Sequence, residues 1–391
     1  MPQLLLKNCR LYTERKSAPV HIVIEDGRIA NILPGDNIPQ DVPAIDADDR
    51  VIAPGFIDVH IHGSGGVDTL TCTPEALPTM KQTLAQFGTT SFLPTIVPVP
   101  DKVATAVDLI LSAMRNPDNI GAEILGIHLE GPFVNPEKRG GIFPESIQPP
   151  DRSRLDDLMQ LCDGELRMMT IAPEMEGGLD LAEELLKQGV IPAFGHTNAT
   201  YDETCTIFNA GVNHVTHLYN AMPSLHHREP GPLLAIYESD TVTCQIISDG
   251  HHVSPDMIRW TRQQIGPDRV VCITDGMQAI GLPEGRYEYN GKPYESKDGS
   301  AFYLDDTLIG TALSLGQLVM KYRECTGCSL EEAINAGSLN PARVLGIDDK
   351  KGTIATGKDA DLVLFNEDFS VWKTLVGGDV VYEEERGIIY E

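Results

Sequence analysis

The sequence predicts an α/β fold in which a TIM-like (β/α)8 barrel is joined to a small β-sandwich domain. Through the middle of the chain, eight short apolar runs alternate with stretches of helix-forming composition, and several of these runs end in a polar residue. Both chain ends instead show the two-residue period of strands. Strands that alternate with helices are typical of a parallel sheet, and eight such units suggest a closed barrel.

The two chain ends are expected to form the small domain together. The two-residue period is clearest in four runs near the termini, Val20–Ile24, Arg28–Leu33, Leu362–Phe365 and Val380–Tyr382. We therefore expect the β-sandwich to consist of residues 1–52 together with 353–391, and the barrel to consist of residues 53–352.

Eight apolar runs between the ends are candidates for the barrel strands. They cover residues 51–62, 89–97, 123–130, 166–172, 189–196, 211–217, 242–249 and 269–275. Helix-forming composition fills several of the gaps, namely residues 74–87, 101–114, 179–188, 202–210 and 255–264. In barrels of this kind the active site lies at the C-terminal ends of the strands, so polar residues at these ends are candidates for chemistry.

Composition and charge narrow the classes of function. With 41% hydrophobic and 22% charged residues, the 391-residue chain has an ordinary globular composition. Its net charge of −27 argues against nucleic acid or an anionic membrane as partner. A phosphorylated small molecule would need only a local cationic pocket, because distant charges are screened within about 8 Å. Eight scattered cysteines and the lack of a long apolar run favour a cytoplasmic protein.

A metal site is expected where the strands end. His60 and His62 close the first run, and residues two apart on a strand point to the same side. Later runs end in further residues with nitrogen or oxygen side chains: Glu130, His196, His217, Asp249 and Asp275. Such ligands suit zinc, iron, manganese or cobalt, and Asp275 could also accept and return a proton there. His128 should also face the barrel interior, either in a structural role or as a residue that supports a metal ligand.

Seven stretches of the chain carry a family resemblance. They are residues 53–63 (APGFIDVHIHG), 126–133 (GIHLEGPF), 195–199 (GHTNA), 216–222 (THLYNAM), 228–231 (REPG), 249–252 (DGHH) and 274–275 (TD). With them the chain resembles, over nearly its whole length, the N-acetylglucosamine-6-phosphate deacetylases of the amidohydrolase superfamily. The HxH motif marks only the superfamily, whereas HLEGP combined with THLYNAM is far more specific.

The resemblance implies a metal-dependent hydrolase that converts N-acetylglucosamine 6-phosphate to glucosamine 6-phosphate and acetate. It implies that Glu130, His196 and His217 hold the main metal and that Asp275 is the catalytic acid/base. Because His60 and His62 are both present, the chain is similar to members with two metals, bridged by Glu130. The expected cofactor is one or two divalent ions per subunit, with zinc first and iron, manganese or cobalt as alternatives.

The same resemblance implies a set of contacts to the phosphorylated sugar. They fall on Gly141, Asn220, Ala221, Arg228, Asp249, His252, Leu308, Ile309 and Gly310. Arg228 is expected to reach the phosphate in a neighbouring subunit, which implies a homodimer. The chain departs from the family pattern at Asp306, where glycine is usual in a loop over the substrate, and at Ile142, where some members carry a substrate-touching histidine.

Three alternatives stay open at this level. The first is the same reaction on N-acetylgalactosamine 6-phosphate, which differs in the position of one hydroxyl. The second is another amidohydrolase acting on a cyclic amide or an N-acyl amino acid, although a neutral cyclic amide has no need of Arg228. The third is a metal-free scaffold, against which the presence of all six candidate ligands argues.

Overall fold

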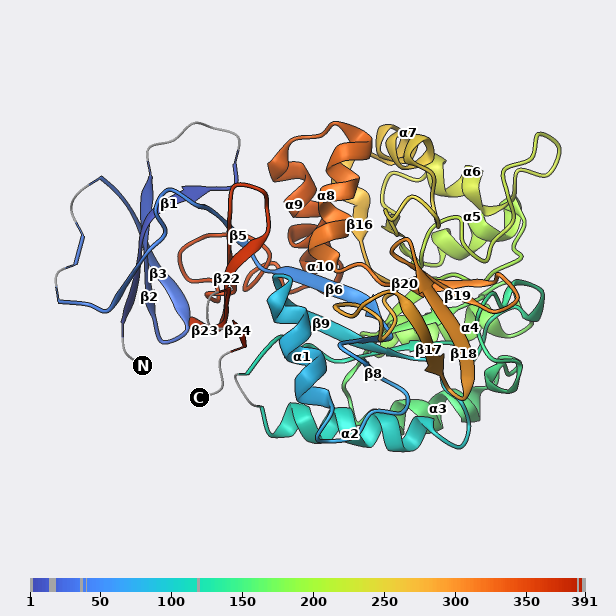
Figure 1. Ribbon diagram of the computed structural model, residues 1–391. Coiled ribbons are helices and arrows are strands. Elements are labelled where there is room, and N and C mark those ends of the chain that lie inside the picture. Colours follow the sequence, from blue (N-terminus) through green and yellow to red (C-terminus); the bar gives the residue numbers. More distant parts are fainter. Residues whose placement is uncertain are drawn as a thin grey trace.

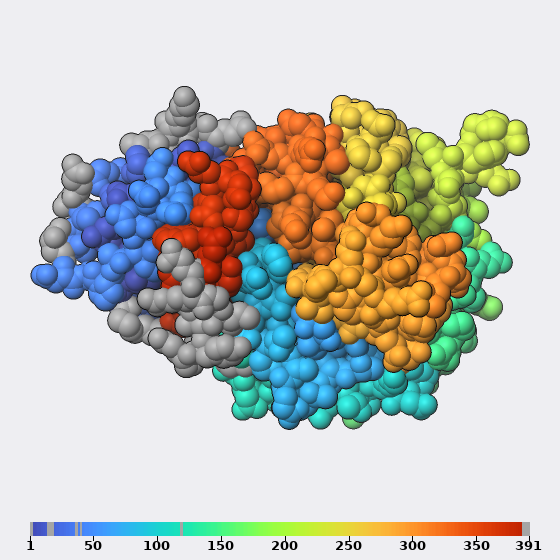
Figure 2. All heavy atoms as spheres, in the orientation of Figure 1, coloured from blue at the N-terminus to red at the C-terminus, as the bar shows by residue number. Residues whose placement is uncertain are grey.

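The computed structural model describes residues 3–13, 19–35, 38–39, 41–117, 120–384 and 387–388, and it contains a parallel barrel beside a sheet built from both chain ends (Figure 1). The predicted fold class is therefore confirmed. Blue atoms from the start of the chain and red atoms from its end lie against each other on one side of the molecule (Figure 2).

The sheet of the chain ends has nine strands. These are β1 (Leu4–Leu11), β2 (Val20–Glu25), β3 (Arg28–Pro34), β4 (Ala44–Asp46), β5 (Val51–Pro54), β21 (Leu362–Phe365), β22 (Val371–Val376), β23 (Asp379–Glu383) and β24 (Gly387–Ile388). β5 joins the two ends because it pairs in parallel with β1 and antiparallel with β21. Buried side chains from both ends share one core that includes Leu6, Ile22, Ile52, Leu362 and Leu375.

Each of the eight predicted runs contains one strand of the barrel. The strands are β6 (Phe56–Ile61), β9 (Thr89–Ile96), β11 (Ile127–Glu130), β12 (Leu166–Ile171), β13 (Ile191–Phe194), β14 (His214–Val215), β15 (Thr243–Ile246) and β16 (Val270–Cys272). They pair in parallel in this order, and the short β10 (Glu123–Ile124) also pairs with β9. The barrel closes where the Asp275 N–H donates to His60 O at 2.8 Å and the His62 N–H donates to Gly276 O at 2.8 Å.

The first predicted run divides at Gly55. Residues 51–54 belong to the sheet of the chain ends, whereas the strand after Gly55 enters the barrel. A Cβ atom at Gly55 would lie 2.1 Å from Oγ1 of Thr90, so a larger residue would not fit where the chain passes from one unit to the other.

Helices cover the outside of the barrel (Figure 1). They are α1 (Leu77–Gln86), α2 (Val103–Arg115), α3 (Arg152–Leu161), α4 (Gly178–Lys187), α5 (Tyr201–Asn209), α6 (Gly231–Glu238), α7 (Pro255–Ile265), α8 (Leu315–Thr326), α9 (Leu330–Gly337) and α10 (Leu339–Val344). The five predicted helical segments correspond to α1, α2, α4, α5 and α7. None of the helices in the described ranges has both the length and the apolar character needed to cross a bilayer.

Short elements complete the connections between strands and helices. Single 3-10 turns are η1 (Pro136–Lys138), η2 (Pro144–Ser146) and η3 (Pro267–Arg269), and a small hairpin pairs β7 (Gly63–Ser64) with β8 (Val67–Asp68).

An antiparallel sheet of four strands is inserted between β16 and α8. It consists of β17 (Gly285–Tyr289), β18 (Lys292–Lys297), β19 (Ser300–Tyr303) and β20 (Leu308–Thr311). The segment after Asp306, where the resemblance places a loop over the substrate, forms strand β20 from Leu308 onward. Asp306 has a φ of 63°, a left-handed backbone that aspartate adopts more readily than most residues, so the turn tolerates the missing glycine.

Candidate active site

The six predicted metal ligands converge at the C-terminal ends of the barrel strands. His60 and His62 come from the end of β6, Glu130 is the last residue of β11, and the remaining three follow β13, β14 and β16. Two groups form, His60 with His62 and Asp275, and Glu130 with His196 and His217. Within each group the nitrogen and oxygen atoms lie within 4.8 Å of one another.

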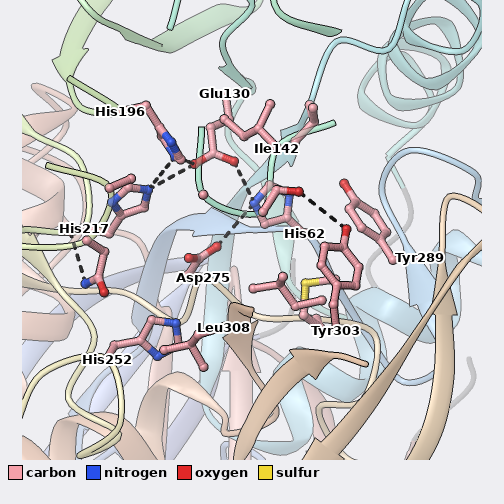
Figure 3. Close-up of a pocket in the computed structure, with 17 residues that line it drawn as sticks. His62, Glu130, Ile142, His196, His217, His252, Asp275, Tyr289, Tyr303 and Leu308 are labelled. Carbon is pink, nitrogen blue, oxygen red and sulfur yellow. Dashed lines mark hydrogen bonds and ion pairs between the residues drawn. The ribbon is translucent and has the colours of Figure 1, made fainter. Parts of the chain in front are cut away.

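The Glu130 carboxylate faces both groups (Figure 3). Its Oε1 lies 3.1 Å from His196 Nε2 and 3.2 Å from His217 Nε2, and its Oε2 lies 3.2 Å from His62 Nε2. Asp275 Oδ1 lies 3.3 Å from the same His62 nitrogen. This arrangement allows one carboxylate to link two neighbouring cation sites.

The backbone aims three of these side chains at the site. His196, His217 and Asp275 have φ values of 47°, 24° and 47°, which residues other than glycine rarely adopt. Each is held by a backbone hydrogen bond in its immediate surroundings; for example, the Asn135 N–H donates to His196 O at 2.9 Å. Such left-handed conformations cluster at functional sites, where the surrounding fold compensates for their strain.

The imidazoles present their Nε2 atoms to the centre of the site. His196 Nδ1 is 2.9 Å from Lys138 O and must donate to it, while its Nε2 lies 3.1 Å from Glu130 Oε1. His60 Nδ1 is 3.0 Å from Gln245 Oε1, and its Nε2 is buried with no hydrogen-bond partner among the described residues. Imidazole nitrogens beside two carboxylates are the donor set of a divalent cation, which would bind in place of protons, so the residues fit such an ion.

The carboxylates are held in their ionised form. Burial by itself would raise the pKa of Asp275, but the adjacent His60 and His62 imidazoles outweigh it and bring that pKa below its usual value. Burial opposes the protonation of His62, yet contacts with Asp275 and Glu130 raise its pKa to about 10. The negative charge of the two carboxylates thus favours a proton on His62, and a bound cation would take the place of that proton.

Sequence reasoning missed a buried amide that holds the ligands in place. Gln245 Oε1 accepts from His60 Nδ1 at 3.0 Å and from the His217 backbone N–H at 3.3 Å. Gln245 Nε2 lies 3.1 Å from His214 Nε2. Burial lowers the pKa of His214 to about 3, so the neutral ring accepts this hydrogen bond. The only signal was that both residues lie on predicted strands, which does not reveal their partners.

His128 has the interior, structural place that the sequence predicts. Its Nδ1 donates to Val59 O at 3.1 Å, and its Nε2 lies 2.9 Å from Thr170 Oγ1. Burial lowers the pKa of this imidazole well below the usual value, so it stays neutral. Its ring centroid lies 4.7 Å from that of His60, and the His128 ring therefore packs against that ligand.

A cavity of about 130 Å³ adjoins the ligand groups. Six of the residues expected to bind substrate line it: Gly141, Asn220, Ala221, His252, Leu308 and Ile309. Ile142 also lines it and presents an apolar side chain. The fold therefore gathers these predicted contacts, which are far apart in sequence, around one space.

Asp249 and Gly310 lie just outside this lining. Asp249 Oδ2 is 2.6 Å from His252 Nδ1 and 2.8 Å from Ser300 Oγ, so Asp249 orients the histidine. Gly310 has a φ of 146°, and a Cβ atom there would lie 2.3 Å from Asp275 O. Only glycine lets β20 approach the backbone of Asp275 this closely.

Arg228 lies away from the cavity of its own chain. It is exposed, and its Nη1 is 2.9 Å from His227 Nε2. The segment that leads from Met222 into α6 projects from the body of the molecule (Figures 1 and 2). Arg228 is not among the residues that line the cavity.

Two tyrosines in the cavity wall were also missed. Tyr289 and Tyr303 both come from the inserted sheet and line the cavity. Alternation in Tyr287-Glu-Tyr289 indicates a strand, but nothing in the sequence shows where that strand packs.

Comparison with known proteins assigns the family. The sequence pattern of the amidohydrolase family matches residues 51–381. The chain is 34% identical to the N-acetylglucosamine-6-phosphate deacetylase of Bacillus subtilis (strain 168), with 97% of each chain covered. It is 35% identical to the N-acetylgalactosamine-6-phosphate deacetylase of Escherichia coli O157:H7, over 96% of this chain and 98% of that one.

A solved structure agrees with these matches. It is that of a mutant N-acetyl-D-glucosamine-6-phosphate deacetylase from Mycobacterium smegmatis in complex with N-acetyl-D-glucosamine-6-phosphate. The two chains superpose with a TM-score of 0.89 at 30% identity, over 97% of this chain and 99% of that one. Since the family pattern spans most of the sequence and the relatives are similar from end to end, the chain belongs to the amidohydrolase family.

Proposed function

We propose that the protein hydrolyses the N-acetyl group of N-acetylglucosamine 6-phosphate to give glucosamine 6-phosphate and acetate. The observation that carries this proposal is a cavity lined by Asn220, Ala221 and His252 that adjoins two linked groups of buried metal ligands. Relatives named for this reaction align with nearly the whole chain.

We infer that the ligand groups hold one or two divalent ions, with zinc the first expectation. Four imidazoles and two carboxylates provide the nitrogen and oxygen donors that zinc prefers, and iron, manganese or cobalt would accept the same set. A bound ion would supply Lewis-acid polarisation of the amide carbonyl and would lower the pKa of a water molecule.

Asp275 is proposed as the acid/base. Its lowered pKa keeps the carboxylate ionised at neutral pH, so it starts as a proton acceptor. It accepts a proton from the attacking water as the water oxygen bonds to the acetyl carbon. It then donates that proton to the amide nitrogen as the carbon–nitrogen bond breaks. The products are the amine and acetic acid, which passes its proton to the amine or to solvent and becomes acetate, and Asp275 is left ionised again.

Recognition of the phosphorylated sugar is proposed to involve two chains. Asn220, Ala221 and His252 line the cavity of one subunit, where they would contact the sugar, and Asp249 fixes His252. Arg228 would reach the phosphate bound in the neighbouring subunit of a homodimer. The projection of its segment from the barrel supports this arrangement. A planar guanidinium can give a phosphate two hydrogen bonds at once.

A second candidate substrate is N-acetylgalactosamine 6-phosphate. The specific observation in its favour is the relative of Escherichia coli O157:H7, which is named for that substrate and is 35% identical over 96% of this chain.

A cytoplasmic location is proposed as well, since all eight cysteines are free thiols, as in a reducing compartment.

The test is acetate release by metal-loaded protein from the two phosphorylated epimers and from unphosphorylated N-acetylglucosamine. A clear preference for N-acetylglucosamine 6-phosphate supports the proposal. A preference for N-acetylgalactosamine 6-phosphate would change the proposed substrate but not the proposed reaction. If none of the three releases acetate, the deacetylase proposal fails, and cyclic amides and N-acyl amino acids are the next substrates to screen.

A further inference from the structure

The hydroxyl of Tyr289 is unsatisfied inside the cavity. The side chain is only 4% exposed and lines the space beside the metal ligands. Within the described part of the chain, its Oη has no hydrogen-bond partner. Buried hydroxyls nearly always have a partner, because an unpaired one has lost its water without compensation. A hydroxyl left unpaired at the wall of a cavity therefore indicates a contact with a bound ligand.

The ring of Tyr289 is held firmly in this place. It is the last residue of β17, where it pairs with Lys292 of β18. Its ring centroid lies 5.4 Å from that of Phe143 and 6.2 Å from that of His62. The inserted sheet is itself attached to the site, because the Thr311 N–H donates to Asp275 O at 3.0 Å. A rigid support of this kind suits a residue that must present one donor at a fixed point.

No neighbour among the described residues accepts a hydrogen bond from Tyr289. Ile142 is apolar, and the Tyr303 hydroxyl is directed to Gly141 O at 3.5 Å. The nearby Asp68 carboxylate accepts from the backbone of Leu70 and from Thr71 instead. In Figure 3 the Tyr289 hydroxyl points to the side of the cavity on which His62, Glu130 and Ile142 lie. It therefore lies on the side of the cavity that the ligands His62 and Glu130 line.

We propose that Tyr289 Oη donates a hydrogen bond to the acetamide oxygen of the substrate and stabilises the negative charge that this oxygen gains as water adds. The inference rests on the proposed deacetylase function, since the reacting acetamide must lie beside Asp275. A phenol is a neutral hydroxyl donor near pH 7, so Tyr289 can give this hydrogen bond.

The variant Tyr289→Phe tests the proposal because it removes only the hydroxyl. We expect kcat on N-acetylglucosamine 6-phosphate to fall about 10²-fold, as for the loss of one oxyanion donor, with KM and metal content close to those of the wild type. The matched control is Tyr294→Phe. Tyr294 is fully buried in the adjacent β18, in the same sheet, and does not line the cavity, so this variant should keep wild-type kinetics.

A second readout separates a contact with the reacting oxygen from a structural effect. With the N-trifluoroacetyl analogue, the fluorine atoms already stabilise negative charge on the oxygen, so the loss caused by Tyr289→Phe should be clearly smaller than with the acetyl substrate. A purely structural defect would lower the rates on both substrates equally and would lower the melting temperature.

Each other outcome overturns the proposal. If Tyr289→Phe keeps the wild-type kcat and KM, the proposed hydrogen bond does not exist. If KM rises while kcat is unchanged, Tyr289 contacts the sugar and not the acetamide. If Tyr294→Phe lowers kcat by the same factor, the loss comes from a disturbed inserted sheet and not from the Tyr289 hydroxyl. If the wild-type protein itself releases no acetate from either phosphorylated sugar, the proposed function fails, and the assignment of Tyr289 fails with it. That case is recognised before any variant is compared.

Discussion

Gln245 is bonded to His60 through the imidazole nitrogen that faces away from the metal site, at 3.0 Å. The same amide oxygen accepts the backbone N–H of His217 at 3.3 Å, so one buried side chain positions a member of each ligand group. The bond to His60 also fixes the tautomer, because Nδ1 carries the proton and Nε2 keeps its lone pair for a cation.

Replacing Gln245 with leucine should therefore weaken metal binding. Loss of a hydrogen-bond partner of a metal-bound histidine typically costs about 10- to 100-fold in affinity, and we expect a loss of this size. The measurement is metal content after dialysis against a graded series of chelator concentrations. Gln82→Leu is the control, since Gln82 is a buried glutamine of α1 that does not line the cavity. Equal metal retention in both variants would contradict the role of Gln245.

Asp275→Asn should lower turnover with little loss of metal from the group formed by Glu130, His196 and His217. The amide cannot accept a proton from water, so kcat should fall by about 10²- to 10⁴-fold. Glu130, His196 and His217 remain, and metal analysis should still find an ion bound to the variant. Asp256→Asn, an exposed change on α7, should have no effect. Turnover by Asp275→Asn at the wild-type rate would exclude the acid/base role.

Arg228→Ala should mainly raise KM for the phosphorylated sugar. Weak activity on unphosphorylated N-acetylglucosamine should change little, because that substrate has no phosphate to bind. Arg259→Ala serves as a control, as this exposed arginine pairs only with Asp256 on its own helix among the ion pairs of the described residues. Equal losses on both substrates would argue against a phosphate contact.

Mixing two impaired variants tests whether each active site uses residues from two subunits. In a hybrid of Arg228→Ala with Asp275→Asn, one active site combines an intact Asp275 with the Arg228 of the other chain. Subunit exchange should therefore restore part of the activity at low substrate concentration. If the mixture shows no more activity than the sum of the separate variants while hybrids form, the arginine does not serve the neighbouring site.

Lys351→Ala should destabilise the connection between the barrel and the sheet of the chain ends. Lys351 Nζ is buried 2.5 Å from Asp361 and 2.7 Å from Glu123 on β10, and Asp361 is itself buried. Removing one partner of a buried ion pair leaves an uncompensated charge and costs about 3–5 kcal/mol. Denaturant unfolding measures the loss, with the exposed neighbour Lys350→Ala as the control. A loss below about 1 kcal/mol would show that the pair is effectively solvated.

Local patterns were sufficient for much of the fold. Barrel strands are buried on both faces, so each appears as an apolar run that ends in polar residues, and all eight were predicted. The inserted sheet was missed because its strands alternate exposed and buried residues over short stretches that resemble loops, as in β18 (Lys292–Lys297). Helices α8 to α10 follow that insertion, beyond the last strand that the repeating pattern identified.

By itself, the sequence determined the fold class, the places where strands end and the chemical types of the ligands. These follow from hydrophobic period and residue identity, which are local properties. Only the tertiary structure decided which atoms meet. Closure of the barrel between His60 and Asp275 brings the ligands together, and the packing of β17 leaves the Tyr289 hydroxyl beside them without a partner among the described residues. Such contacts depend on distances between segments remote in sequence, and no local period encodes those distances.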